Sequence, residues 1–294
     1  MQGENDRHRP HGSLSEMGTC FRPGKQEAFE IIMKRTKTQL DLALLPAEAA
    51  RLLEGAALYD SSCSPQARVV FVERAGGAFL KTAAAGTLQT EAAMTAYYHA
   101  LGLSAEVLLY CTEGEKDFLI TRAIPGEDCC DERYLSDPKR LCDTTATLLR
   151  ALHETPCERC PVDRIASYTD NVRRGLDGSR YEPELFTGMW EFSSCAEAEA
   201  AAREGLPALR SEVLIHGDYC LPNIILQDWR LSGYIDLGNG GLGDRHIDLL
   251  WGVWTLNFNL KTTAWTERFL DAYGRDKIDL EKLRAVAAME MIGG

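Results

Sequence analysis

The sequence predicts an α+β protein with two lobes, a small β-rich N-terminal lobe and a larger, mostly helical C-terminal lobe. Alternating apolar and polar residues form two hairpin patterns before residue 125. From residue 138 onward, apolar residues recur three and four positions apart, which is the helical spacing. Pro125-Gly126 separates the two patterns and indicates a hinge. We therefore expect a disordered or loosely attached leader at 1–32, an N-lobe at 33–121 and a C-lobe at 122–294.

The N-lobe pattern is strand-rich with helices among the strands. The first expected helix has Pro46 at its start, a position that tolerates proline. The elements expected in chain order are a helix at 46–53, a hairpin of 67–73 and 77–81, a helix at 90–101, and a hairpin of 107–111 and 118–124. The apolar face expected for the second helix is formed by Ala93, Ala96, Tyr97 and Ala100.

The C-lobe pattern is mainly helical, with one hairpin. Residues 155–183 are polar, and we expect them to be irregular. The helices expected are 138–153, 195–209, 245–254, 263–273 and 280–289, and the hairpin joins 224–226 to 231–235. The face expected to be buried on the first of these helices is Leu141, Thr145, Leu148, Leu149 and Leu152.

Bulk composition restricts the class of protein. The chain has 294 residues, 45% apolar and 26% charged, as ordinary globular proteins do. Its net charge of −12 disfavours nucleic acid and anionic membranes and favours cationic ligands. No apolar run reaches the roughly 18 residues of a membrane-spanning helix, and the polar N-terminus is unlike a signal peptide. We expect a cytoplasmic protein, and the sequence does not predict its oligomeric state.

One segment, 214–248, carries most of the functional information. His216-Gly217-Asp218 is followed by Asn223, five residues after Asp218, and Asp236-Leu237-Gly238 begins thirteen residues later. The predicted hairpin lies between these groups, so the loops at its two ends should be neighbours. We expect Asp218, Asn223 and Asp236 to lie close together.

These three residues suit phosphoryl transfer from a nucleoside triphosphate. That reaction needs a carboxylate at the attacking hydroxyl, and Asn and Asp ligands for Mg²⁺. Mg²⁺ prefers hard oxygen ligands and keeps several waters, so a small ligand set is sufficient. The spacing Asp-x-x-x-x-Asn is that of the protein-kinase catalytic loop, and Asp236-Leu237-Gly238 is in the place of its DFG triplet.

The N-lobe offers the residues that such a reaction needs to hold the nucleotide. Lys81 ends a predicted strand and Glu91 begins the next helix, as a phosphate-binding lysine and its acidic partner would. Ser64 lies in the loop before the first long strand, where hydroxyl and N–H groups could cover the phosphates. A Walker A motif is absent from the sequence, which excludes the P-loop class.

Two other patterns lead to weaker hypotheses. Residues 238–243 match the dinucleotide fingerprint G-x-G-x-x-G, but no acidic residue follows at the required distance of about twenty residues. The ten cysteines are expected to be reduced thiols, and the lone pair Cys157 and Cys160 is an improbable zinc site without a second pair nearby.

The segments HGDYCLPNI and RLSGYIDLGNGGLGDRHIDL resemble the aminoglycoside phosphotransferase family, especially the kanamycin-kinase-like 3′-phosphotransferases. The resemblance extends to SPQARVVFV, AFLKTA, LITRAIPGED and LRALHETPCERCP. It implies a protein-kinase-like fold and an ATP-dependent, Mg²⁺-dependent kinase, with GTP as a possible donor. The chain departs from the family pattern at Asn239, where the family has Arg, and has few acids besides Glu191 in 187–191.

The resemblance also implies roles for single residues. Lys81 would hold the phosphates with Glu91 as its partner, Ser64 would contact the triphosphate, and Arg122 and Ile124 would offer hinge backbone to adenine. Asp218 would accept or orient the acceptor proton, Asn223 and Asp236 would bind Mg²⁺, and Glu191 would help to bind a cationic acceptor. The residues implied to support the catalytic loop are His216, Asp244 and Asp248.

Two alternatives to an aminoglycoside kinase stay open. The same chemistry could act on another small hydroxyl compound, such as a sugar, an amino alcohol or a different antibiotic. The chain could also bind nucleotide without catalysis, although the complete set of Lys81, Asp218, Asn223 and Asp236 argues against this.

Overall fold

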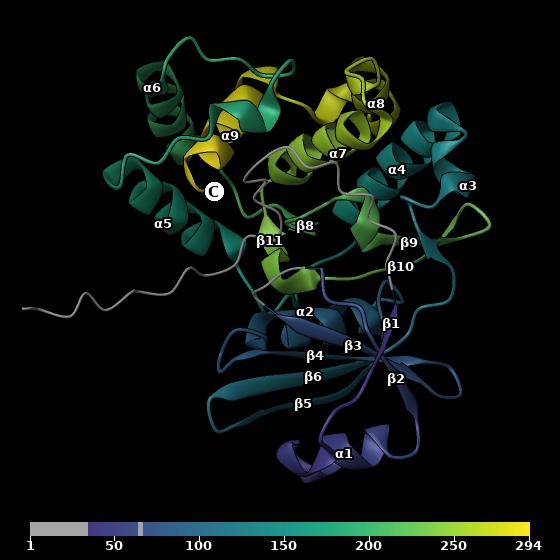
Figure 1. Ribbon diagram of the computed structural model, residues 1–294. Coiled ribbons are helices and arrows are strands. Elements are labelled where there is room, and N and C mark those ends of the chain that lie inside the picture. Colours follow the sequence, from purple (N-terminus) through teal and green to yellow (C-terminus); the bar gives the residue numbers. More distant parts are fainter. Residues whose placement is uncertain (1–34, 64–66) are drawn as a thin grey trace, which may run out of the picture.

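A computed structural model of the chain describes residues 35–63 and 67–294. They form two lobes, with a sheet-rich N-lobe below a helical C-lobe (Figure 1). The predicted leader at 1–32 and Ser64 lie outside the described residues. In the part of the chain that the structure covers, no helix combines the length and apolar character needed to cross a membrane.

The N-lobe is built on a six-stranded antiparallel sheet with the order β1-β2-β3-β4-β6-β5. The strands are β1 (Thr36–Thr38), β2 (Ala57–Asp60), β3 (Arg68–Glu73), β4 (Ala78–Ala84), β5 (Val107–Glu113) and β6 (Lys116–Arg122). Helix α1 (Ala47–Leu53) covers one face of the sheet, and α2 (Gln89–Ala100) lies between the other face and the C-lobe (Figure 1). Both predicted hairpins and both predicted helices of this lobe are present; β1 and β2 were not predicted.

Strand alternation determines which way each N-lobe side chain points. Leu80 and Ile120 pack with α1, whereas Ala83 and Leu119 pack with α2. Successive residues of a strand face opposite sides of the sheet. Lys81, next to Leu80, is therefore directed toward α2 and the C-lobe.

The apolar face predicted for α2 is wrong. Ala93, Ala96 and Ala100 are exposed and Tyr97 is half-buried. The helix instead buries Glu91, Ala92, Met94, Thr95 and Tyr98. The reason is that α2 also contacts the C-lobe, where the Tyr98 hydroxyl donates to the carbonyl of Ile215 at 3.0 Å. Contact with the C-lobe therefore buries polar residues of α2, such as Glu91 and Thr95, which an apolar pattern does not include.

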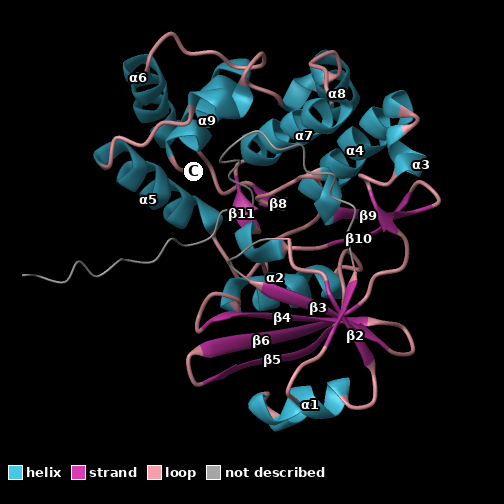
Figure 2. Ribbon diagram, viewed as in Figure 1, coloured by secondary structure: helices cyan, strands magenta, loops and turns pink. Residues whose placement is uncertain are grey.

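The C-lobe consists mainly of helices packed around one apolar core (Figure 2). Its helices are α3 (Glu132–Leu135), α4 (Pro138–His153), α5 (Arg164–Asp177), α6 (Cys195–Gly205), α7 (Arg245–Leu260), α8 (Thr266–Tyr273) and α9 (Leu280–Ile292). Two small sheets carry the functional loops: β10 (Arg230–Tyr234), β9 (Ile224–Gln227) and β7 (Glu127–Asp128) in that order, and β8 (Val213–Ile215) paired with β11 (Gly241–Gly243). On the predicted face of α4, Leu148 is half-buried and the other four residues are buried.

The prediction that 155–183 is irregular is wrong, because α5 lies within it. Asp163 caps this helix by accepting from the N–H of Ile165 at 3.1 Å. Tyr168, Val172 and Leu176 recur every fourth residue and are buried. This stripe is narrow and is surrounded by charged residues, so the overall polarity of the segment concealed its helical period. Helix α7 also extends to Leu260, beyond its predicted end at 254.

Candidate active site

Lys81 connects the two lobes at the base of the site. Its Nζ donates to Glu91 Oε2 at 2.7 Å and to Asp236 Oδ1 at 2.9 Å. Burial disfavours the lysine charge, yet the carboxylates of Asp236 and Glu91 together raise the pKa of Lys81 above its ordinary value. Burial raises the pKa of Glu91 to about 7, although Lys81 opposes this shift. Lys81 therefore stays protonated at neutral pH, between two carboxylates.

Asp236 reaches Lys81 because its backbone turns sharply after β10. It adopts the left-handed helical conformation, with φ 58° and ψ 56°, which aspartate tolerates better than most residues. The following residues, Leu237–Asn239, form one turn of 3-10 helix against α2. The loop thus presents its carboxylate to the N-lobe across the interface between the lobes.

The catalytic loop follows β8 and begins with a glycine that no other residue could replace. Gly217 has φ +77°, and a Cβ atom there would lie 1.9 Å from the carbonyl oxygen of Asn239. Asp218 comes next and is buried. Asn223 Nδ2 donates to the carbonyl oxygen and to Oδ2 of Asp218, both at 3.0 Å. The amide of Asn223 therefore holds the Asp218 side chain in place.

Asp218 has the electrostatic character of a proton acceptor. Burial and the nearby Asp236 carboxylate raise its pKa to about 7, while hydrogen bonds from Cys220 and Asn223 oppose the shift. A carboxylate with a pKa near the working pH is well matched to general-base catalysis.

The residues around Asp236 and Asn223 fit a magnesium site. Because the amide nitrogen of Asn223 donates to Asp218, its amide oxygen is the atom that it could offer to a cation. Within 35–63 and 67–294, no group of three or more His, Cys, Asp or Glu side chains could enclose a metal. One carboxylate and one amide oxygen, completed by waters and substrate phosphates, is a typical ligand set for Mg²⁺.

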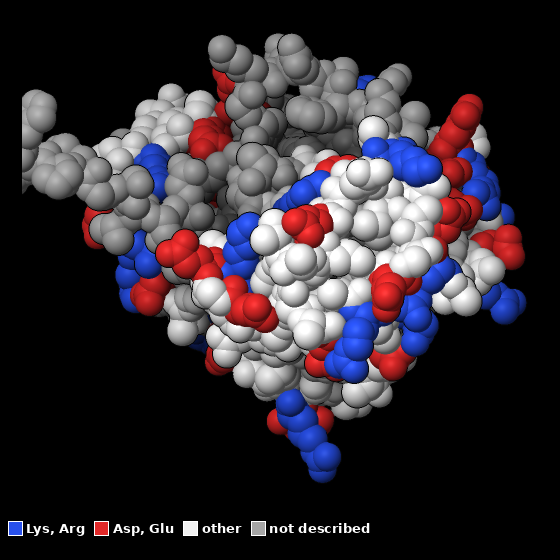
Figure 3. Space-filling model, turned by 60° about the horizontal axis from the view of Figure 1, so that its bottom comes forward, with Lys and Arg blue, Asp and Glu red and all other residues white. Residues whose placement is uncertain are grey.

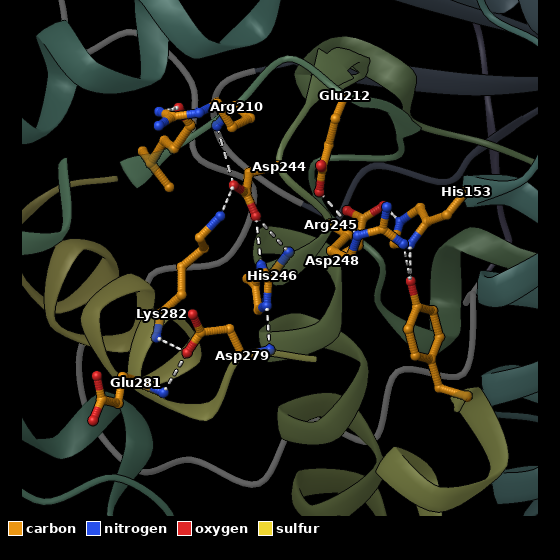
Figure 4. Close-up of polar contacts among 12 residues, drawn as sticks. His153, Arg210, Glu212, Asp244, Arg245, His246, Asp248, Asp279, Glu281 and Lys282 are labelled. Atoms are coloured by element: carbon orange, nitrogen blue, oxygen red, sulfur yellow. Dashed lines mark hydrogen bonds and ion pairs between the residues drawn. The ribbon is translucent and has the colours of Figure 1, made fainter. Parts of the chain in front are cut away.

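Two buried aspartates lie at the start of α7 (Figure 4), and one of them, Asp248, holds the catalytic loop. Asp248 accepts from the backbone N–H groups of His216 and Gly217, both at 2.7 Å. Asp244 caps α7 and accepts from His246 Nδ1 at 2.6 Å and from Lys282 Nζ at 3.0 Å. Burial opposes ionisation of Asp244, but the hydrogen bonds from His246 and Lys282 lower its pKa to about 2.

His216 itself lies inside the C-lobe rather than at the reacting atoms. Its side chain is fully buried, and Nε2 is 3.0 Å from the carbonyl of Ile235. Burial lowers the pKa of His216, so the ring is neutral and its Nε2–H can donate to that carbonyl. This contact joins the two loops that carry Asp218 and Asp236.

Sequence reasoning missed a further layer behind Asp248, formed by His153 and Tyr273. His153 Nε2 is 3.2 Å from Asp248 Oδ2, and its Nδ1 is 2.8 Å from the Tyr273 hydroxyl. Arg245 donates to that hydroxyl at 3.2 Å. Since burial lowers the pKa of His153, the neutral ring donates to Asp248 and accepts from Tyr273. The sequence does hold one indication of this layer, because His153 lies one turn after Leu149 on the buried face of α4, where a histidine needs polar partners.

A small cavity of about 20 Å³ lies beside Asp218, between the catalytic loop and the C-lobe helices. Glu290, on α9, accepts from the Tyr168 hydroxyl at 2.9 Å, and burial raises the pKa of Glu290 to about 7. Sequence reasoning missed this residue as well. The polar residues that line the cavity include Arg164, Tyr168, Asp218, Asn239 and Glu290.

Three predicted site residues lie at the edge of this arrangement. Arg122 ends β6, and its backbone N–H already donates to the carbonyl oxygen of Glu106 at 2.9 Å, so only its own carbonyl could contact adenine. Ile124 follows two residues later, in the hinge. Glu191 is exposed, in the loop before α6, and does not line the cavity beside Asp218. The roles proposed for these residues stay predictions.

Comparison with known proteins identifies the family. The profile of the phosphotransferase enzyme family matches residues 61–286. The chain belongs to this family. A relative from Lactococcus lactis subsp. lactis (strain IL1403), named probable aminoglycoside 3'-phosphotransferase, is 41% identical over 87% of this chain and 97% of its own length. An aminoglycoside 3'-phosphotransferase from Niallia circulans is 30% identical over 60% of this chain and 68% of its own length.

Solved structures confirm the fold of this phosphotransferase. An aminoglycoside-3'-phosphotransferase of type VIII superposes with a TM-score of 0.62 at 26% identity, covering 76% of this chain and 88% of that one. The predicted two-lobed, protein-kinase-like fold and the predicted kinase class are therefore confirmed. The protein is an enzyme that transfers phosphoryl groups to hydroxyl acceptors.

Proposed function

We propose that this phosphotransferase moves the γ-phosphoryl group of ATP to a hydroxyl of an aminoglycoside antibiotic, as a 3′-type enzyme. The observation that carries the proposal is the placement of Asp218 between two sites. On one side lies the Lys81–Asp236 ion pair, and on the other a cavity that also contains Glu290. The 41% identical relative supports the choice of acceptor. GTP is the alternative donor.

On the nucleotide side, the chain offers one cation and two oxygen ligands. Lys81 would bind the phosphates, and Glu91 keeps its ammonium group in position. Asn223 and Asp236 would hold Mg²⁺, which neutralises phosphate charge when bound. Ser64, Arg122 and Ile124 are proposed as further nucleotide contacts.

On the acceptor side, Asp218 would act as the base. The acceptor oxygen bonds to the γ-phosphorus as the bond from that phosphorus to the β–γ bridging oxygen breaks. The hydroxyl proton moves to the Asp218 carboxylate, and the nucleoside diphosphate leaves. A pKa of about 7 allows Asp218 to accept this proton at neutral pH and release it to solvent afterwards.

Charge supports a polycationic acceptor. Aminoglycosides carry several ammonium groups, and charge-assisted hydrogen bonds to carboxylates bind such groups strongly. The chain has a net charge of −12. Acidic and basic side chains are interspersed over the face seen in Figure 3, so this face carries no broad basic patch of the kind that attracts polyanions. Glu290 beside Asp218, and the exposed Glu191, are the proposed contacts.

The direct test measures ADP release with kanamycin, neomycin and paromomycin. We expect turnover with at least one of them, and a KM that rises steeply with ionic strength, because exposed charges are screened beyond about 8 Å at physiological salt. Absence of ADP release with all three, from protein shown to bind ATP, would assign the enzyme to another small hydroxyl compound.

A pair of matched substitutions tests how the acceptor is held. Glu290→Gln and Glu191→Gln each remove one acid, one in the cavity and one on an exposed loop. We expect both to raise KM for kanamycin with little change in kcat, and Glu290→Gln to have the larger effect because its surroundings are less solvated. If only Glu191→Gln raised KM, the acceptor would bind outside the cavity.

We also propose that the enzyme works in the cytoplasm, where nucleoside triphosphate is available. The nine cysteines among the described residues all carry free thiols, as is usual in a reducing compartment. Fractionation of the host cell followed by an ADP-release assay on each fraction tests this. Activity confined to a secreted fraction would contradict it.

A further inference from the structure

Arg164 brings a positive charge into the cavity that Asp218 lines. It is the first residue of α5, and its Nη2 donates to Asn239 Oδ1 at 2.8 Å. Asn239 in turn touches the catalytic loop, since its carbonyl occupies the space where a side chain of Gly217 would begin. Arg164 is thus connected through one residue to the backbone beside Asp218.

The charge of Arg164 has no carboxylate in direct contact, and Glu290 acts on it only from beyond ion-pair distance. Among the residues that the structure describes, no carboxylate oxygen lies within 4.0 Å of its guanidinium. Other arginines of the C-lobe are paired; Arg245 with Glu212 and Arg268 with Asp143 are examples. Burial lowers the pKa of Arg164, which shows that the protein holds this charge at a cost. An unpaired cation in such a place is expected to have a ligand.

Glu290 attracts Arg164 through space but does not contact it directly. Its Oε1 atom accepts from the Tyr168 hydroxyl, and no ion pair joins it to Arg164. Burial raises the pKa of Glu290 to about 7, so at neutral pH it carries only part of a negative charge. Arg164 therefore retains positive charge facing the cavity.

The hydrogen-bond donors of Arg164 are also incompletely used. A guanidinium has five N–H donors in a planar fork. Two contacts account for part of them: Nη2 with Asn239, and Nη1 with Ser167 at 3.2 Å. The remaining donors suit a group with several acceptor oxygens, and phosphate is the group that arginine binds in this bidentate manner.

We infer that Arg164 is a catalytic residue that binds the oxygens of the transferring phosphoryl group and then of the phosphate ester formed on the acceptor. This inference rests on the proposed function. Glu290 would attract the ammonium groups of the acceptor, whereas Arg164 requires an anionic ligand, and the reaction brings an anion next to Asp218. That anion is the phosphoryl group. Its negative charge faces the carboxylate of Asp218 after transfer, and Arg164 offsets this repulsion.

The test uses a mimic of the transferring phosphoryl group and needs no acceptor. The dissociation constant of ADP is measured with Mg²⁺, in the presence and absence of aluminium fluoride, for the wild type and for Arg164→Met and Arg164→Lys. We expect aluminium fluoride to tighten ADP binding in the wild type. Arg164→Met should lose about 10²-fold of this tightening, as loss of one oxyanion-binding group typically does, with ADP binding alone unchanged. Arg164→Lys should lose less, because it keeps the charge without the fork.

The matched control is Arg173→Met, which removes an exposed arginine from the same helix. It should leave aluminium fluoride binding unchanged. If aluminium fluoride tightened ADP binding equally in the wild type and in Arg164→Met, the inference would be overturned. It would also be overturned if Arg164→Met lost ADP affinity equally with and without aluminium fluoride, because that result indicates a structural role.

Kinetics with kanamycin separate this inference from the proposed function. If the wild type turns over kanamycin and Arg164→Met has the same kcat, the proposed aminoglycoside acceptor stands and the proposed role of Arg164 is wrong. Fluoride binding that depends on Arg164, together with no turnover of any aminoglycoside, would retain the role of Arg164 and overturn the acceptor.

Discussion

The two sides of the catalytic loop bury aspartates of opposite character. Asp218, on the reacting side, has a pKa raised to about 7, whereas Asp244, which caps the helix that supports the loop through Asp248, has a pKa lowered to about 2. Both are buried. Asp244 accepts from a lysine and a histidine, while Asp218 accepts from a neutral amide and faces another carboxylate. The character of a buried carboxylate is therefore determined by its donors, and not by burial alone.

Asp248 extends this comparison to the backbone. It accepts the N–H groups of two successive residues, His216 and Gly217, immediately before Asp218. On the supporting side the carboxylate of Asp248 thus fixes the loop, and on the reacting side the carboxylate of Asp218 stays available. The same substitution, aspartate to asparagine, should consequently lower kcat but not stability at Asp218, and should lower stability at Asp248.

The largest effect is expected for Asp218→Asn. Loss of the proton acceptor should lower kcat by about 10²–10⁴-fold with ATP affinity nearly unchanged. The free energy of unfolding should not fall, because the change removes a charge that burial and Asp236 disfavour. ADP-release kinetics and urea unfolding measure the two quantities. Turnover above half of the wild-type value would contradict the assignment of Asp218.

Asp248→Asn should show the reverse pattern. Its amide nitrogen would replace one of the two acceptor oxygens, so the N–H of either His216 or Gly217 would face a donor and lose its partner. We expect the free energy of unfolding to fall by about 3–5 kcal/mol, with activity lost as the protein unfolds. Urea unfolding at constant pH checks this against Asp218→Asn. A variant as stable as the wild type would show that the loop does not depend on Asp248.

Asp244→Asn sharpens the comparison through pH. Because the folded-state pKa of Asp244 is depressed from 3.8 to about 2, its stabilising effect is present above pH 4 and is lost as the pH falls toward 2. The difference in unfolding free energy between wild type and variant should be about 2 kcal/mol at pH 6. This difference should shrink as the pH falls below 4, and urea unfolding between pH 2 and pH 6 measures it. A difference that stays constant with pH would show that Asp244 acts through shape alone.

The sequence predicts the structure best where a single segment contains both a clear alternation of apolar residues and the residues of the site. The long strands of the N-lobe alternate over six or seven residues, and Asp218, Asn223 and Asp236 lie on the two loops that flank one hairpin. Strands β8 and β11 have three residues each, which is too short to show an alternation. Their pairing depends on contacts between distant segments, and local pattern does not contain that information.

The missed site residues share a different property. His153, Arg164, Tyr273 and Glu290 lie on four helices, and each acquires its role from a partner at least 70 residues away in the chain. Helical periodicity predicts that such positions are buried, but it does not predict which polar group will be opposite. Only the packing of α4, α5, α8 and α9 around the catalytic loop brings these partners together.

The smallest effect is expected for Tyr273→Phe, which tests how far support for the loop extends from Asp248. The hydroxyl lies between Arg245 and His153, so its loss leaves His153 Nδ1 without a donor while Asp248 keeps its backbone contacts. We expect the free energy of unfolding to fall by about 1 kcal/mol and kcat to fall less than tenfold. Tyr59→Phe is the matched control, because it removes an exposed hydroxyl bonded to Glu73 in the N-lobe and should change neither quantity. If Tyr273→Phe lowered kcat as much as Asp218→Asn, the supporting side would take part in the reaction itself, and the division between the two sides of the loop would fail.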